Sequence, residues 1–492
     1  MEEEKKLALP EGKLTLRREL EGPAGRLGLL LLLPAALLLL LAAAGICREA
    51  GTIRPVYTTA ALAGIFCLAL LARLLAPKGG RLWLELLFVG AAALRVVFAL
   101  KWTVWPHEEY LAGWNLALEL SRAGAGQWRE LVRSAGEAGA AAPAVYQSIL
   151  IRLFGPTLAA VQIPNGVWGG VSCLLTALIG EKLSGSRLTG LIAGGLLAFC
   201  PTLLFSAGVL TVLPLYTALL LAGVWLLLCR PFARTLLNHG LAGAAWGLCQ
   251  VLCPGLPIPL GAAVLWLLLT LPGRKRDRTL GVRAVTLAAA FLIVWLAAGG
   301  LLWALTGAGP MAGAALGGTG SLRQLAGKIR TQFASYDYSW ARLDRGIPIR
   351  DKIIDSVMHP LLQSYALGLL LLALWGVLRG VKRADRNILL LPALLLAALA
   401  AAALAAEADP IGGSWVIPLL ALLGAAPARQ LADWTVLMAA PETGRGRRKT
   451  APPLPLPLRI VKLVVSVAVY VLMLAMVLIF FTGNGAFIYE AF

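Results

Sequence analysis

Uninterrupted apolar runs long enough to cross a lipid bilayer constrain this chain more than any other feature. Leu27–Ala44 and Leu463–Phe481 contain no charged residue, and about 20 such residues in a helix span the ~30 Å hydrocarbon layer. The 492-residue chain is 59% hydrophobic and only 14% charged, with a mean hydropathy of +0.79. A soluble protein of this length needs more charge to cover its surface. We therefore expect a polytopic integral membrane protein.

The apolar pattern predicts an all-α, polytopic transmembrane helical bundle of about 13 helices, with amphipathic interface helices in two long outside loops. Helices are expected because they satisfy all their backbone polar groups internally within lipid. The predicted membrane helices cover residues 27–46, 55–76, 82–101, 157–180, 188–207, 210–229, 237–254, 256–272, 284–305, 359–378, 388–405, 411–427 and 460–482.

The distribution of lysine and arginine predicts the sidedness of these helices, since both residues collect on the cytoplasmic side. With the N-terminus inside, 28 of the 44 basic residues fall on inside segments and 13 on outside segments. We therefore expect a multi-pass plasma-membrane protein with a cytoplasmic N-terminus and an outside C-terminus. The net charge of +19 then belongs to the ends of membrane helices, and no nucleic acid partner is expected.

This topology divides the chain into seven regions. They are a cytoplasmic tail that is not a cleavable signal (1–26), two N-terminal transmembrane helices (27–81), a transmembrane core (82–305) with a first outside loop (102–156), a second outside loop (306–358), C-terminal transmembrane helices (359–440), a cytoplasmic linker rich in Pro, Gly and Arg (441–459), and a last transmembrane helix with an outside tail (460–492).

The first outside loop carries an apolar stripe at helical spacing, Tyr110, Leu111, Trp114 and Leu118, just after Pro106. Proline is favoured at the first position of a helix. The stripe predicts an amphipathic helix that lies flat in the membrane interface, with its tryptophan at the level of the lipid headgroups.

An acidic pair, Glu108–Glu109, precedes this stripe, with His107 before it. Two neighbouring carboxylates at the edge of a low-dielectric layer repel each other, so that one of them tends to hold a proton and becomes a usable base. The alternative is that both are solvated residues at a helix start, where negative charge suits the helix dipole. A metal site is not expected, because consecutive residues do not share a helix face, and the sequence indicates no cofactor.

The second outside loop mixes cations with aromatic rings around Asp337: Arg330, Tyr338, Trp340, Arg342 and Arg345. Cations can pair with a phosphate while rings stack on a sugar, which suits a sugar joined to a phosphate. An equally good interpretation is an amphipathic surface helix whose basic residues bind lipid headgroups.

The order of features between residues 82 and 230 resembles the GT-C superfamily of membrane glycosyltransferases, which includes protein O-mannosyltransferases and lipid A aminoarabinose transferases. The motifs that carry the resemblance are short, and their order matters more than any one of them. They are a membrane helix with Arg95, the acidic opening Pro106–Tyr110, Ala142–Tyr146, Leu153–Gly155, Val161–Asn165, Gly185–Arg187 and a helix ending at Cys200–Pro201.

The resemblance implies an inverting transferase that moves a sugar from a polyprenyl-phosphate donor at the outer membrane face. Its acidic residue at the start of the first outside loop would accept a proton from an acceptor glycan, lipid or protein. The family usually opens with Asp-Glu, and alignment on Tyr110 puts His107 at the aspartate position. Shifting by one makes Glu108–Glu109 the pair, with Glu108 as the favoured base. Arg330, Arg342 and Arg345 would stabilise the departing phosphate.

Two other functions remain open. A transporter or lipid flippase usually carries charge within its membrane helices and broken helices in repeated halves. Arg95 is the clearest such charge here, and no internal repeat is evident. The third hypothesis is a non-catalytic scaffold of the same fold, which the histidine at the aspartate position of the family supports.

Overall fold

The computed structural model describes residues 34–37, 39–40, 43, 55–79, 82–101, 109–136, 140–253, 258–269, 278–309, 359–383, 390–396 and 415–439. Within these residues the chain is helical and contains no strand. The principal helices are α3 (Pro55–Gly79), α4 (Leu82–Lys101), α5 (Glu109–Arg122), α6 (Trp128–Ala135), α7 (Ala141–Phe154), α8 (Ala159–Ser184), α9 (Arg187–Ala198), α10 (Pro201–Gly208), α11 (Leu213–Cys229), α12 (Thr235–Leu252), α13 (Ile258–Leu269), α14 (Arg278–Thr306), α17 (His359–Arg383) and α19 (Ile417–Ala439).

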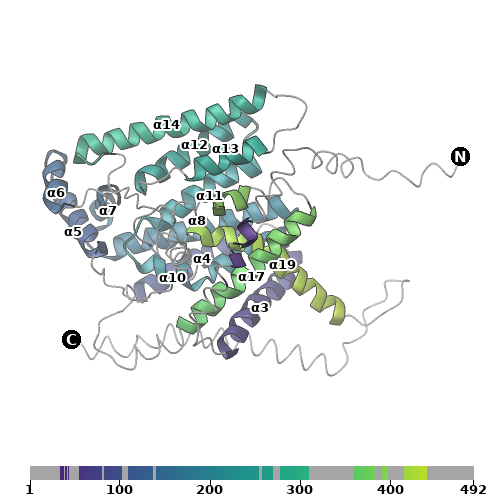
Figure 1. Cartoon of the computed structure of the whole chain (residues 1–492). Helices are drawn as coiled ribbons and strands as arrows, with labels where there is room; N and C mark the ends of the chain where they lie inside the picture. Colours follow the sequence, from purple (N-terminus) through teal and green to yellow (C-terminus); the bar gives the residue numbers. More distant parts are fainter. Residues whose placement is uncertain are drawn as a thin grey trace, which may run out of the picture.

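The helices form a bundle with α8 near its middle (Figure 1). Helix α8 packs against α4, α9 and α11, while α12 joins α11 to α14 along one side. Helices α3, α17 and α19 pack together on the opposite side. The short helices α5, α6 and α7 lie together at one end of the bundle (Figure 1), and we call this group the end layer.

Three helices among the described residues are long and apolar enough to cross a membrane: Leu82–Lys101, Ala159–Ser184 and Gly281–Thr306. A fourth span results if α9 and α10 are taken together. Large apolar side chains of α14 are exposed along its length, including Val285, Ile293 and Leu301. A helix with this surface suits contact with lipid rather than water. The expected all-helical membrane bundle is therefore supported, while 13 membrane crossings remain a prediction.

The predicted single helix 188–207 is broken. Helix α9 ends at Ala198, α10 begins at Pro201, and the two axes differ by 62°. Proline disfavours the helical conformation for the residue before it, and Cys200 is accordingly extended, with φ −67° and ψ 115°. Pro201 then occupies the first turn of α10, where its missing N–H costs no hydrogen bond.

Glycine pairs four residues apart bring the central helices close together. A Cβ atom on any of these glycines would overlap a neighbouring helix, because atoms of that helix lie within 3.0 Å of the position that the Cβ would take. Small residues at this spacing let membrane helices approach closely. The pairs are Gly166 and Gly170 of α8 against α4, Gly190 and Gly194 of α9 against α8, and Gly243 and Gly247 of α12 against α14.

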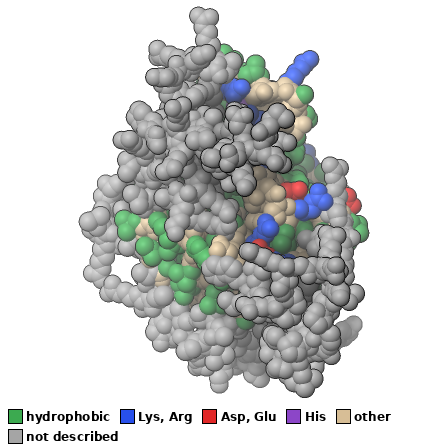
Figure 2. Space-filling model, turned by 90° about the vertical axis from the view of Figure 1, so that its right-hand side faces the viewer, with side chains coloured by type: hydrophobic (Ala, Val, Ile, Leu, Met, Phe, Trp, Pro, Cys, Tyr) green, Lys and Arg blue, Asp and Glu red, His purple; other side chains and the backbone are tan. Residues whose placement is uncertain are grey.

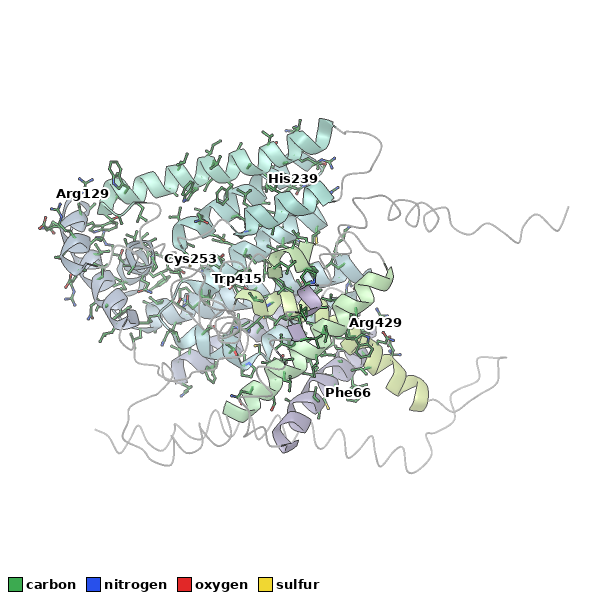
Figure 3. The ribbon with its side chains drawn as sticks, in the orientation of Figure 1. Phe66, Arg129, His239, Cys253, Trp415 and Arg429 are labelled. Atoms are coloured by element: carbon green, nitrogen blue, oxygen red, sulfur yellow. The ribbon has the colours of Figure 1, made fainter. Side chains whose placement is uncertain are left out.

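Helix ends that the topology predicts on the cytoplasmic side lie together, opposite the end layer. There Asp433 of α19 pairs with Arg73 of α3 and with Arg429 of its own helix, the latter at 3.4 Å. Arg429 also donates to Thr189 Oγ1 of α9 at 3.2 Å. Figure 3 places Arg429 and His239 at this end and Arg129 at the other. Figure 2 looks onto this end, where basic and acidic side chains lie beside each other.

The described part of the predicted first outside loop is folded rather than extended, since it contains α5, α6 and α7. Helix α5 carries the expected stripe, but Trp114 is only 7% exposed, so its ring packs inside the protein rather than against lipid headgroups. Trp114 instead belongs to a buried cluster with Leu120, Trp128 and Ile151. Burial of two indole rings between short helices gives the layer a hydrophobic core of its own.

Most predicted boundaries agree with the structure to within a few residues, as for 82–101 and α4. Helix α19 is the largest exception, because it continues through Pro427 to Ala439 rather than ending at residue 427. More than half of the predicted helices 27–46 and 388–405 lies outside the described residues, as do nearly all of the predicted second outside loop and the whole of the predicted helix 460–482.

Candidate functional site

A small, mostly apolar pocket lies within the bundle, at the end covered by α5–α7 (Figure 1), and five polar residues contribute to its lining. Its walls come from α4, α8, the α9–α10 break and the start of α11. Its volume of about 20 Å³ holds roughly one water-sized molecule, and it is partly open. The polar side chains in its lining are Arg95, Asn165, Ser172, Ser206 and Thr217.

Arg95 is the charged group of this pocket and is 1% exposed. It lies on α4, six residues before the helix ends at Lys101. Gly169 of α8 makes room for it, because a Cβ at that position would overlap Cδ and Nε of the arginine. The Arg95 guanidinium group places a positive charge inside the bundle.

The break between α9 and α10 exposes backbone carbonyls that other helices satisfy. The last carbonyls of a helix have no intrahelical partner. Arg95 Nη2 donates to Leu197 O at 2.8 Å, and Tyr365 Oη of α17 donates to Leu196 O at 2.5 Å. Arg95 Nη1 also donates to Ala91 O at 3.2 Å. Part of the guanidinium therefore caps the end of α9, where a positive charge is favourable.

Three amide side chains hold the segment between α10 and α11 in place. Gln147 of α7 donates to Leu210 O at 2.8 Å, and Gln162 of α8 donates to Gly208 O at 3.0 Å. Asn165 donates to Val209 O at 3.2 Å and to Thr211 O at 3.0 Å. Buried carbonyls outside a helix require such partners. These bonds fix the start of α11 beside the pocket and join it to α7 of the end layer.

Tyr146 of α7 gives the end layer a second polar link to the bundle. Trp168 Nε1 of α8 donates to Tyr146 Oη at 3.2 Å. Burial raises the pKa of the Tyr146 phenol, and this hydrogen bond offsets part of the rise. The phenol is therefore neutral at physiological pH.

Most of the predicted site residues lie outside the described part of the chain: His107, Glu108, Arg330, Asp337, Tyr338, Trp340, Arg342 and Arg345. Glu109 and Tyr110 are the first two residues of α5, and only their backbone is described. The structure therefore gives no distance between the acidic pair and the basic and aromatic residues of the predicted second outside loop. Among the described residues, no three His, Cys, Asp or Glu side chains are close enough together to hold a metal ion.

Sequence reasoning identified Arg95 as an unusual membrane charge but missed its polar neighbours. The signal was present in α8, where Gln162, Asn165, Gly169 and Ser172 recur at helical spacing within an apolar helix. Such a polar stripe predicts one face turned toward a cavity or a partner rather than lipid. The contributions of Ser206 and Thr217 depend on the bend at Cys200–Pro201. The family resemblance placed a helix end there, whereas hydropathy alone predicted one helix over 188–207.

Fold and site together define a helical membrane protein with a buried cationic pocket beneath a layer of short helices. Comparisons of this chain with protein-family models, with curated proteins and with solved structures found no match. Its function must therefore be argued from its own residues.

Proposed function

We propose that this protein is an inverting membrane glycosyltransferase that moves a sugar from a polyprenyl-phosphate donor to an acceptor at the outer membrane face. The observation that carries the proposal is the position of α5. This helix begins at Glu109, within the acidic pair, and belongs to the layer over the bundle end that holds the Arg95 pocket. An acidic group and a cation at the same end of a membrane bundle suit transfer from a charged lipid donor.

The packing of the end layer fixes the position of α5, the helix that follows the proposed base in the sequence. Trp128 Nε1 of α6 donates to Leu120 O of α5 at 3.0 Å, and Arg129 donates to Ala304 O at the end of α14 at 3.2 Å. These contacts tie α5 and α6 to each other and to a membrane-length helix. A catalytic carboxylate at the start of such a helix keeps its position better than one on an isolated loop.

In the proposed reaction, the Glu108 carboxylate accepts the proton of the acceptor hydroxyl or amine. The acceptor atom forms a bond to the anomeric carbon of the sugar as the bond from that carbon to the lipid phosphate breaks. The bonding electrons leave with the phosphate, whose charge the proposed cations Arg330, Arg342 and Arg345 stabilise. Attack opposite the leaving group inverts the anomeric centre.

The test is sugar transfer by purified protein in proteoliposomes supplied with a polyprenyl-phosphate sugar and candidate acceptors. We expect Glu108→Gln to lower the rate by about 10²-fold or more, because the base is lost. Glu119→Gln is the matched control, since Glu119 is an exposed carboxylate on α5. Full activity of both Glu108→Gln and Glu109→Gln would contradict the catalytic assignment.

Transport is the second candidate, and the broken helix favours it. Transporters often place a helix break and a buried charge beside their substrate site, and here Arg95 bonds to the last turn of α9 at such a break. This function predicts substrate movement across a sealed liposome without covalent change, and Glu108→Gln would leave that movement intact. Appearance of a new glycosidic product would instead assign the transferase.

A further inference from the structure

The pocket contains a positive charge without a carboxylate partner. No Asp or Glu among the described residues lies within ion-pair distance of Arg95. The α9 C-terminus offsets the charge only in part, since a helix end carries about half an elementary charge. A buried charge left unpaired in a low-dielectric interior is costly. The site therefore favours a negatively charged partner.

The polar groups that remain free in the pocket include hydrogen-bond donors. Two of the five N–H donors of the guanidinium have carbonyl acceptors, which leaves others for the Cys173 thiol nearby and for the pocket. Thr217 Oγ1 is buried and has no hydrogen-bond partner. The residue lies in the first turns of α11, whose N-terminus carries positive partial charge and lines the pocket through Leu213 and Pro214.

Hydrogen-bond acceptors in the pocket do not reverse its preference for a negatively charged ligand. The hydroxyls of Ser172 and Ser206 donate to Trp168 O and Leu203 O, each at 3.0 Å. Asn165 Oδ1 is buried without a partner, while its amide hydrogens are directed to backbone carbonyls. This oxygen suits a water beside the ligand. No described carboxylate balances the arginine, so the net charge of the lining is positive.

The enclosed volume suits a ligand atom about the size of a water molecule. About 20 Å³ accommodates a water molecule or a halide ion. We propose that the pocket binds a single anionic acceptor atom, held by Arg95 and the Thr217 hydroxyl. A free chloride ion can supply this atom, and so can one oxygen of a lipid phosphate that stands at the pocket mouth. This proposal does not depend on the transferase function.

The experiment measures thermal unfolding of the full-length protein in detergent, transferred to sodium gluconate and titrated with sodium chloride or sodium bromide at constant ionic strength. We expect a saturable rise in Tm with both halides. Thr217→Val should weaken the apparent halide affinity by about tenfold, because it removes one hydrogen bond to a charged group while keeping the side-chain shape. Thr176→Val is the matched control, since Thr176 is equally buried but donates to Ser172 O at 2.7 Å.

A second arm identifies the source of the anion. Polyprenyl phosphate in mixed micelles, at zero halide, should raise Tm and compete with bromide if a phosphate oxygen enters the pocket; stabilisation by halide alone assigns a free ion. Arg95→Gln should abolish the rise in Tm with halide and with polyprenyl phosphate. If Arg95→Gln does not fold, the response of Thr217→Val tests the proposal instead. The proposal is overturned if the wild type responds equally to gluconate and halide with no effect of polyprenyl phosphate, or if Thr176→Val and Thr217→Val behave alike. Either of these outcomes is expected if the pocket holds only water.

Discussion

Arg152 links α7 to α5 and α6 within the end layer, and its substitution tests how these three helices are held together. Its guanidinium donates to three backbone carbonyls at the end of α5: Leu120 O at 2.8 Å, Ser121 O at 3.1 Å and Ala123 O at 2.6 Å. It also lies 5.3 Å from the ring centroid of Trp128. Carbonyls at a helix end have no intrahelical donors, so Arg152 satisfies most of the C-terminus of α5, while Trp128 Nε1 also donates to Leu120 O.

The expected effect of Arg152→Ala is local. Each hydrogen bond is worth about 0.5 kcal/mol after allowance for the exposed side chain, and the cation–π contact contributes a similar amount. The loss of about 2 kcal/mol corresponds to roughly 30-fold faster opening of the α5 C-terminus. The opening rate of Arg152→Lys should lie between those of the wild type and Arg152→Ala, since an ammonium group keeps the charge but not the planar geometry of the guanidinium.

Hydrogen exchange followed by mass spectrometry measures this opening directly. Peptides covering α5 should exchange about 30-fold faster in Arg152→Ala, while peptides from α12 stay unchanged. Arg122→Ala is the control, because Arg122 is exposed at the same helix end and should change exchange only a few-fold. Exchange of α5 within twofold of the wild type in Arg152→Ala would refute this account of the end layer.

Three further substitutions test other parts of the structure by thermal or denaturant unfolding. Gly169→Ala should cost about 1–3 kcal/mol, because its Cβ displaces the buried arginine beside it; Gly90→Ala, with no atom within 4 Å of its Cβ, should cost nothing. Asp433→Asn should cost only about 0.5–1 kcal/mol, and less at high salt, because the carboxylate is 31% exposed. Trp246→Phe should cost about 1–3 kcal/mol, since it leaves a void and removes the 3.1 Å bond to Leu220 O; an unchanged midpoint would contradict that packing.

Hydropathy and periodicity were sufficient to predict the helices themselves. Runs such as 82–101 have no other stable conformation in lipid, and the stripe through Trp114 placed α5 correctly. The same rules did not identify what Trp114 packs against, because an amphipathic stripe specifies an apolar contact and not its partner. Here the partner is the end layer and the bundle rather than lipid.

The pocket could be predicted only in part. Arg95 and the polar stripe of α8 are visible in the sequence, because charge and amides are rare inside membrane helices. Their convergence with Thr217 depends on the 62° bend at Cys200–Pro201 and on close helix contact at glycines. The proline indicates a helix end locally, but the direction in which the chain continues and the neighbours it meets are tertiary features.

The central claim is that the bundle end covered by α5–α7 faces away from the cytoplasm, since both the transferase and the donor lipid require that sidedness. The direct measurement is labelling with a membrane-impermeant maleimide in intact cells, in a chain whose seven cysteines are replaced by alanine. We expect Glu130→Cys on α6 to react from outside, and Phe232→Cys, between α11 and α12, to react only after permeabilisation. The reverse pattern would contradict the account.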